Sequence, residues 1–72
     1  MDMIDRMVAI REDHDETQRS LAKALGFAQA QLARYETRKH EPPMRYVLAF
    51  CQHYGVSADY LLGLPRGLEW PR

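Results

Sequence analysis

Residues 17–36, TQRSLAKALGFAQAQLARYE, carry the signals of two short helices and a tight turn between them. The Thr17 hydroxyl can cap a helix over residues 18–25, and Gly26 can end that helix in the left-handed conformation. Phe27 and Leu32 have the spacing of a hydrophobic staple at the start of a second helix. The stretch therefore predicts a helix-turn-helix unit.

A helix over residues 29–37 would have two unlike faces. At about 100° per residue, Leu32 and Tyr35 share the inward side, and the other side carries small, polar or basic residues: Gln29, Ala30, Ala33, Arg34 and Thr37. Such side chains can lie against base edges in a DNA major groove. The solvated face of any amphipathic helix can have the same composition, so this pattern alone leaves both interpretations open.

Four separated motifs occur in a familiar order and spacing: TQ..LA..LG, LARYE, Pro42 and GVSADYLLG at residues 55–63. Together they resemble the lambda-repressor-like, Cro-type (XRE) family of helix-turn-helix regulators, over about residues 4–63. The resemblance implies an all-α, five-helix DNA-binding domain with the helix-turn-helix at helices 2 and 3. It also implies a transcriptional regulator, a repressor by analogy, that binds double-stranded DNA as a homodimer. Carried over by position, it implies base reading by Gln29, Ala30 and Arg34 and a phosphate contact by Gln18.

The helix predicted over residues 3–14 contains a charge in line with its apolar stripe. Ile4, Met7 and Val8 recur at helical spacing, and Arg11 continues their line. A lone buried charge is costly. The helical wheel puts Glu36 on the inward face of the helix over residues 29–37, the recognition helix of the family, where it can be the partner of Arg11. The family resemblance implies the same bridge. We therefore expect a largely buried Arg11–Glu36 ion pair rather than two surface charges.

The sequence departs from the family pattern at three points. Glu16 stands where an apolar residue is usual, which predicts a looser start of the second helix. Ala28 stands where Ser or Thr commonly caps the recognition helix, and Gln31 could partly compensate by accepting from the Ala28 amide. Thr37-Arg38 replaces a frequent glycine, so the helix must end in a non-glycine conformation or continue for another turn.

Charge is unevenly distributed along a chain whose net charge is zero. Residues 1–16 hold two bases and six acids, a charge of −4, whereas residues 17–41 hold five bases and two acids, a charge of +3. The positive field thus lies on the segment expected to face DNA. Within it we expect Arg38, Lys39 and His40 to contact phosphates, the alternative being ordinary solvated surface.

The C-terminal half predicts two more helices and a tail. Pro42 and Pro43 should occupy the first turn of a helix that runs to residue 54. The core stripe of this helix is Val47, Phe50, Cys51 and Tyr54. Tyr46 and Leu48 fall outside that stripe. Ser57 should cap the last helix, which ends at Gly63 and closes the core with Tyr60, Leu61 and Leu62. Residues 1–63 form the predicted domain and residues 64–72 an irregular tail. In that tail, Leu68 and Trp70 either fold back or form a dimer contact.

Composition narrows the classes of function. One cysteine, Cys51, allows no internal disulfide, and the longest apolar run, residues 46–51, is far too short for a bilayer. We expect a cytoplasmic protein with no membrane partner, metal, cofactor or small-molecule substrate. Cys51 and His53 would diverge on a helix, so we expect no enzyme. The alternative to DNA binding is a protein-interaction module of the same fold, such as an antitoxin-like or anti-repressor subunit.

Overall fold

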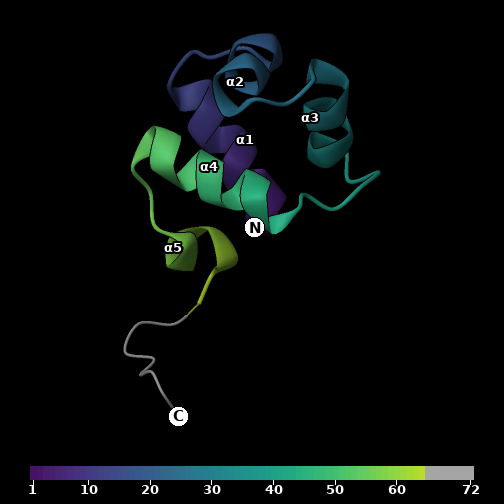
Figure 1. Ribbon diagram of the computed structural model, residues 1–72. Helices are drawn as coiled ribbons and strands as arrows, with labels where there is room; N and C mark the ends of the chain where they lie inside the picture. Colours follow the sequence, from purple (N-terminus) through teal and green to yellow (C-terminus); the bar gives the residue numbers. More distant parts are fainter. Residues whose placement is uncertain (65–72) are drawn as a thin grey trace.

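The computed structural model describes residues 1–64, which form five α-helices and no strand (Figure 1). The helices are α1 (Met3–Asp13), α2 (Gln18–Leu25), α3 (Gln29–Glu36), α4 (Met44–Tyr54) and α5 (Ala58–Leu62). The all-α, five-helix prediction is confirmed, although α1 and α3 each end one residue earlier than predicted. Leu68 and Trp70 lie outside the described residues.

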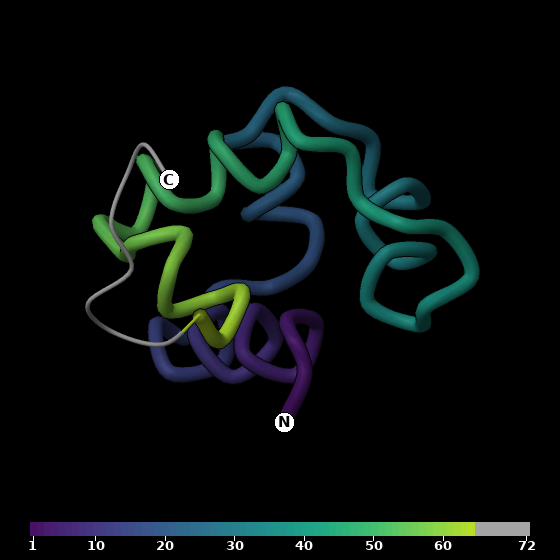
Figure 2. The backbone as a smooth tube through the Cα atoms, turned by 90° about the horizontal axis from the view of Figure 1, so that it is seen from below, coloured from purple at the N-terminus to yellow at the C-terminus, as the bar shows by residue number. Residues whose placement is uncertain are grey.

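The packing of the helices leaves α3 at one end of the described fold. α2 packs against α3 and α4, α1 packs against α3 and α5, and α4 packs against α5. Seen in two perpendicular directions, α3 and α5 lie at opposite ends (Figures 1 and 2). α3 is therefore supported by α1, by α2 and by Tyr46 of α4, and the side that carries Gln29, Ala30 and Arg34 is exposed.

A single apolar core joins all five helices. Leu21, Leu32 and Leu61 are completely buried, and each comes from a different helix; the other buried members are Met7, Ile10, Ala22, Tyr35, Tyr46, Val47 and Phe50. Phe27 packs against the same cluster, close to Tyr35 and Tyr46 in edge-to-face geometry. The predicted staple residues Phe27 and Leu32 thus both belong to the core.

The prediction that Tyr46 lies outside the core is wrong. This side chain is 2 % exposed, and its ring lies 5.2 Å from that of Phe27 and 4.9 Å from that of Tyr35. A single stripe on the wheel underestimated the buried face of α4, because its first turn also contacts aromatic residues of the helix-turn-helix. Leu48 is exposed, and the predicted stripe residues Cys51 and Tyr54 are only partly buried.

The prediction that Tyr60 and Leu62 close the core is also wrong. They are 57 % and 48 % exposed, whereas Leu61 between them is completely buried. α5 is only five residues long, and neighbours on a helix point about 100° away from each other. A helix with one buried side therefore takes only Leu61 into the core.

The two prolines precede α4 instead of forming its first turn. Pro43 is the N-cap, with ψ 159°, and its carbonyl accepts from the amides of Tyr46 and Val47 over 2.9 and 3.2 Å. A residue that precedes proline is disfavoured in the α-helical region, which keeps Pro42 out of the helix, and Pro43 itself has an extended backbone. The helix consequently begins at Met44.

Helix starts are capped as the sequence predicts. The hydroxyls of Thr17 and Ser57 accept from the amides of Ser20 and Tyr60 over 3.0 and 3.1 Å. At α3, Ala28 has no side-chain cap, and Gln31 Oε1 accepts from the Ala28 amide over 3.0 Å. The expected compensation by Gln31 is confirmed, although it satisfies only the N-cap amide.

The start of α2 is held by polar contacts and is not left loose, in contrast to the prediction from Glu16. The Glu16 carboxylate accepts from Ser20 Oγ over 3.0 Å and contacts His53 Nε2 at 2.8 Å. This contact with His53 holds the pKa of Glu16 below its usual value. A charged residue can replace the usual apolar staple here because α4 brings a polar partner to it.

Candidate nucleic-acid interface

α3 presents the two faces that the sequence predicts. Leu32 and Tyr35 are buried, whereas Gln29, Ala30 and Arg34 are exposed. Gly26, with φ 78°, ends α2 in the left-handed conformation and lets the chain turn directly into α3. The three candidate base-reading residues therefore share one open surface of a helix whose opposite side is fixed in the core.

An ion pair joins the end of α3 to the end of α1. Arg11 Nε and Nη2 donate to Glu36 Oε2 and Oε1 over 2.7 and 3.0 Å. The two side chains are 12 % and 11 % exposed, so the pair is largely buried, as expected. The Glu36 carboxylate raises the pKa of Arg11, and Arg11 Nη1 also donates to the Glu16 carbonyl over 2.8 Å. This geometry fixes the rotation of α3 about its axis.

Gln18 also belongs to this polar junction, which the sequence did not indicate. Its Nε2 donates to Glu36 Oε1 over 2.9 Å. Gln18 is the first residue of α2, so the bond connects the start of α2 to the end of α3. A side-chain amide nitrogen has two hydrogens, and one therefore remains for the phosphate contact expected of Gln18.

The segment that follows α3 is basic and exposed, with Arg38 in a special conformation. Arg38 has φ 65°, and the amides of Arg38 and Lys39 donate back to the carbonyls of Tyr35 and Arg34 over 3.2 and 2.9 Å. These are the two bonds of a Schellman motif, usually built on glycine. Arg38 thus adopts the left-handed conformation that is usual for glycine, so the helix ends in neither of the two ways predicted from the missing glycine.

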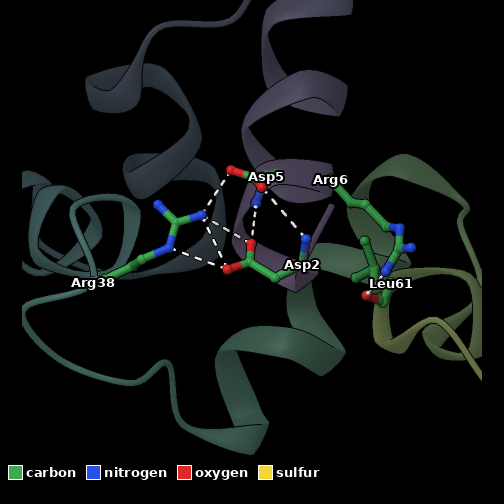
Figure 3. Close-up of polar contacts among 5 residues, drawn as sticks. All are labelled: Asp2, Asp5, Arg6, Arg38 and Leu61. Atoms are coloured by element: carbon green, nitrogen blue, oxygen red, sulfur yellow. Dashed lines mark hydrogen bonds and ion pairs between the residues drawn. The ribbon is translucent and has the colours of Figure 1, made fainter.

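Arg38 does not extend freely into solvent, because two carboxylates of the α1 N-terminus bind it (Figure 3). Its Nη2 lies 2.9 Å from Asp2 Oδ1 and 2.7 Å from Asp5 Oδ1, and its Nε donates to Asp2 Oδ2 over 3.2 Å. The hydrogen bonds from Arg38 lower the pKa of Asp2 to about 2. Sequence reasoning missed Asp2 and Asp5; the acidic character of residues 1–16 was the only signal.

Lys39, His40 and Arg34 are exposed, and among residues 1–64 none of them has an ion-pair partner. They therefore present positive or titratable groups along and just beyond α3. Arg45, another exposed base that the sequence reasoning did not single out, lies with its Cζ 4.5 Å from the Phe27 ring centroid. Within the described part of the chain, no helix is both long and apolar enough to cross a bilayer.

Three comparisons with known proteins agree with this geometry. Residues 6–62 match the family model described as a helix-turn-helix domain. The chain is 34 % identical over 59 residues to the uncharacterized HTH-type transcriptional regulator YobD of Bacillus subtilis (strain 168). That alignment covers 82 % of this chain and 53 % of YobD, so the chain spans about half the length of this curated relative.

The fold is similar to that of a solved DNA complex. The crystal structure of the P22 c2 repressor protein with synthetic operator 9T, in the presence of Tl⁺, superposes with a TM-score of 0.77 and 29 % sequence identity. The match covers 86 % of this chain and 94 % of the repressor chain. The five-helix arrangement is therefore that of a lambda-repressor-like DNA-binding domain.

Proposed function

The chain belongs to the helix-turn-helix domain family, and on that premise we propose that it is a sequence-specific, DNA-binding transcriptional regulator. The observation that carries this proposal is the orientation of α3. The buried Arg11–Glu36 pair fixes the helix while Gln29, Ala30 and Arg34 remain exposed on its outer surface. The structural likeness to a repressor described in complex with its operator supports the same reading.

The three exposed side chains have the chemistry to read base pairs. The Gln29 amide can pair with adenine, the Arg34 guanidinium can pair with guanine, and the Ala30 methyl group can contact the methyl group of thymine. α3 would enter the major groove with residues 29–37 along the base edges. Specificity would then be distributed over a few base pairs in each half-site.

Phosphate contacts would hold the helix in register without reading sequence. The free amides at the N-termini of α2 and α3 suit an anion, and Gln18 adds a side-chain donor beside the first of them. Lys39, His40 and Arg38 would contact the backbone beyond the C-terminal end of α3. The +3 charge of residues 17–41 supports this role even though the whole chain is neutral.

We further propose that the chain acts as a homodimer and represses transcription. Two copies would place their recognition helices on half-sites about one helical turn apart, or a multiple of it. A chain of 72 residues buries a smaller fraction of its surface on folding than a larger domain does, so association would also stabilise it. A DNA-binding role would place the chain with the genome, in the cytoplasm of a cell without a nucleus.

We propose no enzymatic role. Cys51 and His53 were the candidate nucleophile and general base in the sequence. In the structure, His53 Nε2 lies 2.8 Å from Glu16 Oε1. Burial raises the pKa of the Cys51 thiol, which disfavours the reactive thiolate. His53 instead joins α4 to the segment before α2, and Cys51 packs against the core.

Selection of bound sequences from a random duplex pool tests the proposal, with the mass of the protein measured in the same buffer. We expect a palindromic consensus and a dimer mass. The competing role is a protein-interaction module, which the zero net charge and the neutralisation of Arg38 favour. Binding that falls steeply with salt supports DNA contact; recovery of no consensus, with no salt-dependent binding, supports the module.

A further inference from the structure

Arg38 is an exposed residue that combines three features. It follows the recognition helix by two positions, it has a left-handed backbone, and its side chain contacts two carboxylates 33 and 36 residues away in sequence. Figure 3 shows the guanidinium reaching both Asp2 and Asp5, while the neighbouring Arg6 points the other way, to Leu61. The contact therefore joins the basic end of the proposed DNA surface to the acidic end of α1.

The carboxylates offer Arg38 the kind of acceptor that a phosphate offers. Both oxygens of Asp2 and one oxygen of Asp5 lie 2.7 to 3.2 Å from its nitrogens. Arginine forms the same charge-assisted, forked hydrogen bonds with carboxylates and with phosphates. The acidic pair thus occupies donors that a DNA backbone would otherwise use.

The contact is open to exchange because it is at the surface. The side chains of Arg38, Asp2 and Asp5 are 48 %, 56 % and 49 % exposed. A surface hollow of about 440 Å³ borders Asp2 and Arg38, and His40, Glu41 and Pro42 also line it. A phosphate oxygen can therefore approach the guanidinium from solvent without disturbing the core.

We propose that Asp2 and Asp5 compete with DNA phosphate for Arg38, so that Arg38 changes partner when the duplex binds and the acidic pair weakens binding. This inference rests on the proposed function. Part of the acidic charge that makes the chain neutral overall lies directly against the basic segment after α3. The two carboxylates would therefore lower the affinity of the chain for DNA.

The test uses substitutions that keep the backbone intact. Asp2 is the N-cap of α1 and Asp5 completes its capping box, and asparagine keeps the accepting oxygen while it removes the charge. Arg38→Asn suits the left-handed conformation better than alanine does. The variants are therefore D2N/D5N, R38N and the triple combination, with D13N/D15N as a control that removes two exposed charges elsewhere.

Dissociation constants for the selected duplex are measured by fluorescence anisotropy over a range of salt concentrations. We expect D2N/D5N to tighten binding about two- to fivefold, in line with the strength of an exposed ion pair. R38N should weaken binding and reduce the salt slope by about 1. In the R38N background, D2N/D5N should no longer produce the gain, and D13N/D15N should not reproduce it in the wild-type background.

Two results would overturn the competition. An equal gain from D2N/D5N with and without Arg38 would mean that the carboxylates only repel DNA in general. Weaker binding by D2N/D5N would mean that the contact is a clamp that positions the segment after α3. If neither the wild type nor any variant binds DNA, the proposed function itself fails. This outcome differs from the two above, in which the variants bind but their affinities change in the unexpected direction.

Discussion

Arg11 Nε lies 2.7 Å from Glu36 Oε2, and this contact ties the last turn of α1 to the last residue of α3. Gln18 shares the Glu36 carboxylate, so all three helices around the candidate interface meet at one side chain. A change at Glu36 should therefore affect the stability of the domain before it affects any contact with DNA.

Glu36→Ala should lower the free energy of unfolding by about 3 kcal/mol, because it leaves the largely buried Arg11 without its partner. Urea denaturation of the purified protein measures the loss. Glu41→Ala removes a charge from an exposed residue and serves as the control, with a change within about 0.5 kcal/mol. Equal midpoints for Glu36→Ala and wild type would show that the pair contributes nothing.

Ala22→Leu should destabilise the domain by about 1 to 3 kcal/mol, because Ala22 is 1 % exposed where α2 packs into the core. The matched control is Ala24→Leu, the same substitution at an exposed position of the same helix. Thermal unfolding followed by circular dichroism compares the two. Similar melting temperatures for the two variants would mean that the core has room for leucine at position 22, which would contradict the tight packing of Ala22.

Ala28→Ser should stabilise the domain by about 1 kcal/mol, since it adds the missing side-chain cap at the start of α3. Gln31 accepts from the amide of residue 28, and the amide of residue 31, which now donates to the Ala28 carbonyl over 3.1 Å, would gain the new hydroxyl as an acceptor. The measurement is chemical denaturation, with Ala24→Ser as a mid-helix control that should be neutral or slightly unfavourable. A loss of stability in Ala28→Ser would contradict the capping geometry.

Acid should weaken the contact between Asp2 and Arg38 in a defined range of pH. The pKa of Asp2 is lowered from 3.8 to about 2 in the folded chain, mainly by the hydrogen bonds from Arg38. A lowered pKa means that the stabilisation is complete above pH 3.8 and is lost as the pH falls through about 2. NMR titration of the Asp2 carboxyl in wild type and R38N measures it. R38N should return the pKa part of the way to 3.8, because the Asp5 amide still donates to Asp2, and an unchanged pKa would contradict the pairing.

Local signals predicted the helix-turn-helix well. Thr17, Gly26 and Gln31 define helix ends through bonds to residues three or four positions away, which can be identified along the sequence. The Arg11–Glu36 pair was also accessible, because a charge within an apolar stripe requires a partner and few candidates faced inward. These features follow from capping chemistry and helical periodicity, and the family resemblance implied the same ion pair.

Features set by the packing of distant elements were not accessible. The burial of Tyr46 depends on where α4 contacts Phe27 and Tyr35. The exposure of Tyr60 depends on which side of α5 packs against α1. The contact between Arg38 and Asp2 spans 36 residues and involves no apolar pattern. Periodicity identifies the face of a helix that is buried, but it does not identify the partner that covers it.

The orientation of Arg34 toward DNA is the central claim, and binding of Arg34→Ala and Lys39→Ala to the selected duplex tests it most directly. Each variant is titrated against that duplex and against a panel with single base-pair changes. We predict that Arg34→Ala loses about 1 to 3 kcal/mol of binding free energy on the selected duplex and no longer discriminates at one base pair. Lys39→Ala should weaken binding to every duplex alike. If both variants bind all duplexes as the wild type does, the surface of α3 that carries Arg34 does not read DNA.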